Sequence, residues 1–233
     1  MKDNCICIAG DVKDSRRQDP VWLIASLKEC QTLLNETFAD DLLIPFDIRN
    51  GDEVVGVLKR FSVGYFAARR LMEVLQEKEI HLYTGLGLGH LDTPDATVHT
   101  MNGTAVLNAF QARDHFLKKQ LPEVTQWKTK GKKKTDIFFY SEAYPYQALN
   151  ALLYAILEKT YSRTDKQKKA IDFIRQNPGF SYEQIGKELG YESPKSTISY
   201  LLARADYDGV NAMEDSLQSL LDDLQKWFKK EEL

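Results

Sequence analysis

Apolar positions in the first 143 residues switch between the two-residue period of a strand and the longer period of a helix. Asp19 and Pro20 mark one helix start, since Asp favours the N-cap and Pro the first helical position. Short apolar runs predict strands over 4–9, 43–48, 53–58, 80–89 and 136–140. Helical spacing predicts helices over 20–40, 61–78 and 103–119.

The turn between the second and third predicted strands carries Asn50-Gly51, which is typical of a tight β-hairpin because both residues tolerate positive φ. The predicted order is therefore β-α-β-β-α-β, followed by a further helix and strand. This order is typical of an α+β protein with a ferredoxin-like sheet domain and additions to it.

Residues 181–205 predict two short helices joined by a tight turn. Ser181 and Gln184 form a capping-box pattern at the first helix, and Gly190 supplies a left-handed residue at its end. Ser193 is expected to cap the second helix, with Pro194 at its first position. A short helix, a glycine-containing turn and a second helix form the pattern of a helix-turn-helix.

The second helix of this pair combines an apolar stripe with a polar outer face. In a helix-turn-helix the second helix enters the major groove of DNA, so its outward residues are candidates for DNA contact. A plain pair of packed helices without DNA contact is the alternative. The expected buried residues are Ile198, Leu201, Leu202 and Ala205, and the DNA-contact candidates are Lys195, Ser196, Thr197, Ser199, Tyr200 and Arg204.

Two further helices complete the predicted organisation. An apolar helix over 144–161 links the halves, and a last amphipathic helix covers 211–228. The apolar face of the last helix packs on its own domain or pairs with a second copy of the chain, because dimeric DNA readers use two copies. We therefore expect a sheet domain over 1–143, a linker helix over 144–162 and an all-α helix-turn-helix domain over 163–233.

Length and composition agree with two globular cores, since the chain has 233 residues, of which 43 % are hydrophobic. No apolar run approaches the ~18 residues of a membrane span, and the N-terminus lacks a signal-peptide pattern. An odd count of three cysteines indicates a reducing cytoplasm, with Cys5 and Cys7 as buried small hydrophobes. The net charge is −3, but lysine and arginine concentrate in 128–134 and 163–169 and could contact phosphate there or remain solvated.

Carboxylates follow the first strand and lie in the predicted hairpin turn. Asp11 comes directly after strand one, and Asp52 and Glu53 follow Asn50-Gly51. Neighbouring strands would bring these groups to one edge of the sheet, where they could hold Mg²⁺ or Mn²⁺ against a triphosphate. The alternatives are a turn role for Asp52 and a capping role for Asp11.

Several short motifs follow one another in the order found in a known group of enzymes. They are Gly10-Asp11, Asn50-Gly51-Asp52-Glu53-Val54, the glycine-rich stretch 83–89 and residues 103–113. This order resembles class III nucleotidyl cyclases and, more distantly, GGDEF-domain cyclases. The resemblance implies that Asp11 and Asp52 are metal ligands, and it makes Asn108 and Arg113 candidates for stabilising the reacting phosphates.

A closer resemblance is to the SatD family of small bacterial proteins, and it covers roughly residues 5–206. It rests on 10–17, 51–53, 85–89, the Ala-Leu-Asn-Ala-Leu-Leu segment 148–153, the helix start at 164–167 and a sigma-factor-like helix-turn-helix. This resemblance implies a cyclase-like domain joined to a DNA-binding-like domain, and it carries no established activity.

The sequence departs from the cyclase pattern in three places, one of which is that it shows no clear lysine–aspartate pair for reading a purine. Asn108 and Arg113 are five residues apart instead of four, which on an α-helix places them off a common face. The loop after Asp11 holds the basic residues Lys13, Arg16 and Arg17, which either bind phosphate directly or remain solvated. The alternating glycines of 85–89 are expected to permit close packing or the approach of a ligand.

We therefore interpret the chain as a cytoplasmic DNA-binding regulator that acts as a homodimer without membrane contact. Its sheet domain would sense a nucleotide or phosphorylated small molecule through Asp11, Asp52, Glu53, Arg16 and Arg17. One alternative is a metal-dependent nucleotidyl cyclase or nucleotidyltransferase. A second alternative is a non-catalytic interaction or dimerisation module.

Overall fold

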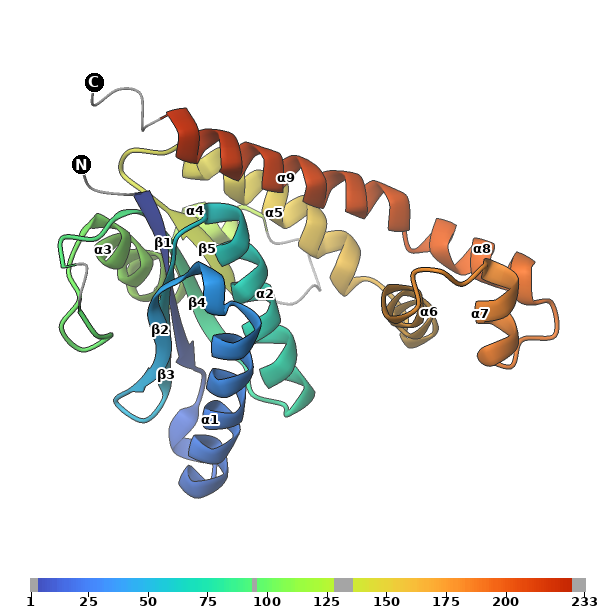
Figure 1. Ribbon diagram of the computed structural model, residues 1–233, viewed down its shortest axis with the longest axis horizontal. Coiled ribbons are helices and arrows are strands. Elements are labelled where there is room, and N and C mark those ends of the chain that lie inside the picture. Colours follow the sequence, from blue (N-terminus) through green and yellow to red (C-terminus); the bar gives the residue numbers. More distant parts are fainter. Residues whose placement is uncertain (1–3, 94–95, 128–135, 228–233) are drawn as a thin grey trace. The chain divides into compact units, whose positions relative to one another are not determined.

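The computed structural model describes residues 4–93, 96–127 and 136–227, and it is a mixed α+β structure (Figure 1). The chain divides into two compact units. The first comprises Met1–Asn150 together with Gln218–Leu233, and the second comprises Ala151–Leu217.

A five-stranded sheet forms the centre of the first unit, with strand order β2-β3-β1-β4-β5. The central strand β1 pairs antiparallel with both β3 and β4, and β5 adds parallel to β4. All five strands were predicted within two residues of their observed ends at each side, apart from the end of the first, which extends three residues further. The strands are β1 (Asn4–Val12), β2 (Leu42–Arg49), β3 (Glu53–Leu58), β4 (Leu82–His90) and β5 (Ile137–Tyr140).

The predicted hairpin between β2 and β3 is confirmed. Arg49 pairs with Glu53 across the turn, and Asn50 and Gly51 both adopt positive φ. Because these residues tolerate the left-handed region, the turn closes tightly. It brings Asp52 next to the end of β1, where the Val12 amide donates to the Asp52 carbonyl at 3.0 Å.

Helices cover both faces of the sheet. On one face, Cys5, Cys7 and Ala9 of β1 share a core with Ala105 and Ala109 of the following helix. On the other face, Ile6 lies so close to Gly64 that a Cβ there would clash with it. The helical segments of this unit are α1 (Pro20–Thr37), α2 (Phe61–Glu77), α3 (Thr104–Phe110) and α4 (Pro122–Thr125), with short turns η1 (Ser15–Arg17) and η2 (Ala39–Asp41).

The glycine-rich strand β4 allows a helix backbone to lie directly on the sheet. A Cβ on Gly87 would come closer than 3.0 Å to the Ala105 carbonyl oxygen and the Ala109 amide nitrogen. Gly85 and Gly89 meet the same helical segment in the same way. The expectation that these glycines permit close packing is confirmed, and the backbone approach fixes the segment that carries Arg113.

The helix predicted over 103–119 changes its winding partway along. After α3 the chain continues as a π-helical segment, η3 (Gln111–Leu117). The Lys118 amide donates to the Arg113 carbonyl five residues earlier, at 3.0 Å. Because this segment bonds from residue i to residue i+5, the α-helical spacing expected between Asn108 and Arg113 does not hold over it.

Both edge strands of the sheet are covered by an asparagine side chain. The Asn35 amide donates to the Phe46 carbonyl at 3.0 Å and accepts from the Phe46 amide at 2.8 Å. Asn150 makes the same pair of bonds with Phe139 on β5, at 2.8 and 2.9 Å. Each asparagine thus imitates a neighbouring strand, which blocks pairing with another chain at that position.

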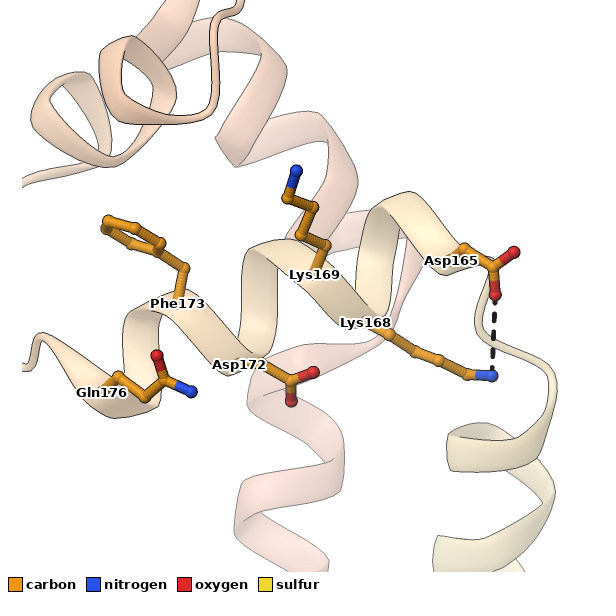
Figure 2. A pocket seen from close by; sticks show the side chains of 6 residues that line it. All are labelled: Asp165, Lys168, Lys169, Asp172, Phe173 and Gln176. Atoms are coloured by element: carbon orange, nitrogen blue, oxygen red, sulfur yellow. Dashed lines mark ion pairs between the residues drawn. The ribbon is translucent and has the colours of Figure 1, made fainter. Parts of the chain in front are cut away.

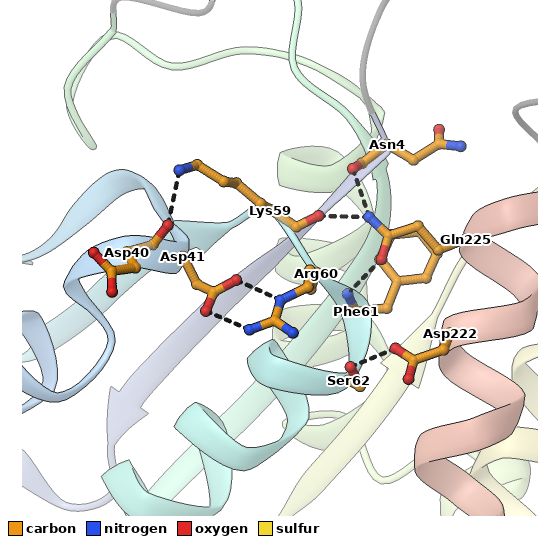
Figure 3. Close-up of polar contacts among 9 residues, drawn as sticks. All are labelled: Asn4, Asp40, Asp41, Lys59, Arg60, Phe61, Ser62, Asp222 and Gln225. Carbon is orange, nitrogen blue, oxygen red and sulfur yellow. Dashed lines mark hydrogen bonds and ion pairs between the residues drawn. The ribbon is translucent and has the colours of Figure 1, made fainter.

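The end of the last helix, α9 (Tyr207–Trp227), is part of the first unit and is bonded to the start of α2 (Figure 3). The Gln225 side chain accepts from the Phe61 amide at 3.0 Å and donates to the carbonyls of Asn4 and Lys59. Asp222 accepts from the Ser62 hydroxyl at 2.5 Å. These bonds satisfy backbone groups where α2 begins, so this end of α9 belongs structurally to the sheet unit.

The second unit contains most of α5 (Tyr146–Tyr161), the first part of α9 and three complete helices. They are α6 (Asp165–Gln176), α7 (Tyr182–Glu188) and α8 (Pro194–Arg204). Their common core includes Ile171, Ile185, Ile198 and Leu202. The predicted capping box of Ser181 and Gln184 is confirmed, and Gly190 has φ +76°, as the left-handed helix end requires.

The outer side of α6 is a shallow depression of mixed charge (Figure 2). Asp165 and Asp172 lie among Lys168 and Lys169 along one side of the helix, and Lys168 is paired with Asp165 at 3.9 Å.

Across the described part of the chain, we find no helix with the length and apolar character needed to cross a membrane.

Candidate functional site

The outward face of α8 is exposed, as its pattern predicts. Ile198, Leu201 and Leu202 are buried, whereas Tyr200 keeps 62 % of its surface exposed. Lys195, Ser196, Ser199 and Arg204 are also exposed, and Thr197 is half-buried. Thr197 therefore offers less surface to a partner than the other five candidates.

The two cations of α8 have no ion-pair partner within the part of the chain that the structure describes. Lys195 and Arg204 both extend from exposed positions. By contrast, Lys187 of α7 lies 2.7 Å from Glu183, and Lys159 lies 2.9 Å from Asp206. Since α8 contains no acidic residue, its outer surface is positively charged.

The start of α8 differs from the prediction in one detail. Ser193 occupies the N-cap position before Pro194, but its side chain caps no backbone amide. The Ser193 carbonyl instead accepts from the Ser196 hydroxyl at 3.2 Å. Gly186 of α7 lies against Pro194 with no room for a Cβ, so the packing of the two helices positions this end of α8.

A second candidate site lies where β1 ends and β3 begins. Asp11 and Glu53 are register partners on these neighbouring strands. Arg113 reaches Glu53 at 3.4 Å, and Lys118 lies 3.0 Å from Asp11. Arg113 of η3 and Lys118, which directly follows η3, thus lie against the two strand carboxylates, and Asp114 pairs with both cations.

Burial and ion pairing shift the titration of these groups in different directions. Burial raises the pKa of Asp11, although the hydrogen bond from Lys118 opposes this rise. Burial alone would also raise the pKa of Asp114, but its hydrogen bonds from Arg113 and Lys118 lower it. Arg113 is only 3 % exposed, and its guanidinium lies 4.5 Å from the centre of the Phe110 ring.

The three predicted metal ligands lie at one edge of the sheet, where Asp11 is the register partner of Glu53, but each has a different partner. Asp11 pairs with Lys118, Glu53 pairs with Arg113, and Asp52 accepts a hydrogen bond from Ser15 at 2.7 Å. Among the described residues, no three His, Cys, Asp or Glu side chains group as metal ligands would. Asp11 and Asp52 interact electrostatically, and their hard oxygens fit Mg²⁺ or Mn²⁺ in chemistry.

In the basic loop after β1, Lys13 is bound by other side chains, whereas Arg16 and Arg17 are exposed. Lys13 forms an ion pair with Asp136 and lies 4.3 Å from the centre of the Tyr83 ring. Arg16 and Arg17 are exposed on η1 and pair with no acidic group in the ranges 4–93, 96–127 and 136–227. Of the three predicted phosphate contacts, these two are available to a ligand in solution.

The structure gives Asn108 and Arg113 separate roles. The Asn108 side chain is buried and donates to the Leu88 carbonyl at 2.8 Å. Arg113 donates instead to Glu53 and Asp114. The two side chains therefore do not share a common target in this arrangement.

Sequence reasoning missed four residues of the strand-end cluster: Asp114, Lys118, Tyr83 and Asp136. Asp114 and Lys118 could have been found, because an acid and a lysine four residues apart on a helix often pair. Asp136 could not, since it lies 123 residues from its partner Lys13. The lysine run within 128–134 lies outside the described residues.

Searches with the sequence find no matching family model and no curated protein of significant similarity.

Proposed function

We propose that the chain is a SatD-like DNA-binding regulator, in which α8 contacts duplex DNA and the sheet unit binds a nucleotide or phosphorylated small molecule. The observation that carries the DNA-binding part is the outer face of α8. It is exposed, contains no acid, and presents Lys195 and Arg204 without ion-pair partners in the described chain. Such free cations can replace the counterions of DNA phosphates.

Two features of the fold support this proposal. The β-α-β-β-α-β order and the strand order β2-β3-β1-β4 support a ferredoxin-like core of the cyclase type. The helices α7 and α8, joined through Gly190, support a helix-turn-helix. Proteins with one helix-turn-helix per chain bind two DNA half-sites as dimers, so we expect two copies of the chain on each DNA site.

The ligand-binding part rests on the strand-end cluster. Arg16 and Arg17 are exposed close in sequence to Asp11, and Asp52 interacts electrostatically with that carboxylate. Arginine binds phosphate through two parallel hydrogen bonds. A phosphorylated ligand held by these groups would regulate DNA binding if the protein has two conformations that differ in their affinity for DNA and the ligand binds one of them more tightly.

Fluorescence anisotropy of a labelled duplex pool tests the proposal with the full chain at increasing salt. We expect binding at low salt, with an affinity that falls linearly on a log–log plot as salt rises. Absence of binding at low salt would refute the DNA-binding function and favour an interaction module.

A second candidate function is a metal-dependent nucleotidyl cyclase or nucleotidyltransferase. It is favoured by one observation: the turn that holds Asp52 is bonded to the end of β1 next to Asp11, where the Val12 amide donates to the Asp52 carbonyl at 3.0 Å. Two carboxylates could hold Mg²⁺ or Mn²⁺, which would clamp the oxygens of a triphosphate. Release of pyrophosphate from ATP or GTP with Mn²⁺, lost in Asp52→Ala, would establish this activity.

A further inference from the structure

The exposed surface of α8 is arranged as a ridge between two flanks. Successive residues of an α-helix rotate by about 100° around its axis. The buried residues Ile198, Leu201 and Leu202 therefore mark the side opposite Ser196, Tyr200 and Ala203. These three positions form the ridge that extends farthest from the core of the second unit, and none of them is charged.

The two cations lie on opposite flanks of this ridge. Lys195 falls beside Ser199 on one flank, and Arg204, nine residues later, falls on the other, half a turn around the helix. At about 1.5 Å of rise per residue, they are separated by ~13 Å along the axis. A helix that lies in the DNA major groove has phosphates on both sides of it, so cations on opposite flanks of the helix face opposite groove walls.

We infer that the ridge residues Ser196 and Tyr200 contact base edges, while Lys195 and Arg204 bind the phosphates of the two groove walls. This inference rests on the proposed DNA binding. The uncharged ridge suits the groove floor, because hydroxyl groups donate to or accept from bases, and the Tyr200 ring offers an apolar contact to a thymine methyl group. The cations are suited to the walls, since phosphate contacts position a protein without reading sequence.

Lys195 forms no ion pair within the part of the chain that the structure describes, although the Glu183 carboxylate is near enough to interact with its charge. A shallow groove at this end of α8 is lined by Lys195, Ser196, Ser199 and Glu183, among others. Glu183 would repel a phosphate, but Lys187 lies 2.7 Å from its carboxylate and offsets that charge. Ser196 and Tyr200 are exposed, so replacing them leaves the core of the unit intact.

Selection of bound sequences from a random duplex library, combined with salt titrations, tests this division of labour in the full chain. Lys195→Gln and Arg204→Gln should each weaken binding to every sequence and reduce the salt slope by about 0.9, without changing the selected sequences. Ser196→Ala and Tyr200→Ala should change the selected sequences while keeping the wild-type salt slope. Lys168→Gln, on the mixed-charge surface of α6 (Figure 2), serves as the matched control and should change neither.

Tyr200→Phe separates the two ways in which the ridge could read DNA. Retained preference in this variant assigns recognition to the ring, and changed preference assigns it to the hydroxyl. If Tyr200→Ala and Ser196→Ala both keep the wild-type preference, or if the cation variants keep the wild-type slope, the assignment is overturned although DNA binding stands. If the wild-type chain binds no duplex, the proposed function fails and the assignment fails with it.

Discussion

The Lys118 ammonium lies 3.0 Å from the Asp11 carboxylate, at the place where a metal-bound nucleotide would need that carboxylate free. The same ammonium lies 3.0 Å from Asp114, so it has a second partner to which it can turn. Binding of a divalent ion at Asp11 therefore requires Lys118 to move. Lys118 would therefore compete with any divalent ion for the Asp11 carboxylate.

Removing this competitor should strengthen metal and nucleotide binding. We expect Lys118→Gln to increase the thermal shift produced by Mn²⁺ with a nucleoside triphosphate, because Asp11 loses its internal cation. Asp52→Ala should abolish the shift, whereas Asp40→Ala, at an exposed acid of η2, should leave it unchanged. Equal shifts in the wild type and Asp52→Ala would exclude Asp52 from the site. A ligand at a hundred times its Kd adds about 2.7 kcal/mol, so a true site gives a clear signal.

Acid stability should depend on the contact between Arg60 and Asp41. Two hydrogen bonds from the guanidinium, at 2.6 and 2.7 Å, lower the pKa of Asp41. Because the folded pKa is below the unfolded one, the carboxylate stabilises the fold above about pH 4, and this contribution is lost as pH falls through the folded pKa. Asp41→Asn should therefore lower the free energy of unfolding at neutral pH. The difference in this free energy between the wild type and the variant should become smaller as the pH is lowered. Urea unfolding at several pH values measures this, and a gap that does not depend on pH would contradict it.

The glycine at position 87 should tolerate no side chain. Its Cβ would meet the backbone of Ala105 and Ala109, which cannot move without displacing α3. We expect Gly87→Ala to lower the free energy of unfolding by about 3 kcal/mol or more. At Gly10, also in the sheet, the nearest atom is a Leu82 methyl carbon at 3.2 Å, so Gly10→Ala should cost much less. Similar losses in denaturant unfolding for both variants would refute the close-approach explanation.

The asparagines at the sheet edges should differ in importance. Asn150 is 2 % exposed, so Asn150→Ala leaves the Phe139 amide and carbonyl buried without partners, at a cost of about 2–3 kcal/mol. Asn35 is only partly buried, and water can replace its bonds to Phe46. Chemical denaturation should therefore rank Asn150→Ala as the more destabilising change. The reverse order would show that the two edges are not protected in this way.

Local signals predicted much of this fold. The strand over 53–58 has the predicted bounds, and the hairpin follows from Asn50-Gly51, because its φ angles depend on these residues alone. The buried stripe of α8 also follows from spacing, since helical periodicity assigns each side chain to a face.

Features that depend on distant contacts could not be predicted. The backbone of η3 lies against Gly85 at Arg113, and no local sequence pattern predicts the π-helical winding of this segment. The docking of Gln225 on Phe61, 164 residues away, likewise depends on tertiary structure (Figure 3). In the candidate site, strand order brought Asp11 beside Glu53 as expected, but their partners Lys118 and Arg113 became clear only from the path of η3.

DNA binding through α8 is tested most directly by reversing its charges. Anisotropy with labelled duplex DNA compares the wild-type chain with Lys195→Glu/Arg204→Glu, and Lys168→Glu on α6 serves as control. We expect the double variant to lose binding at every salt concentration where the wild type binds, because it places acids against phosphate, while the control retains it. Unchanged affinity and salt slope in the double variant would contradict the account.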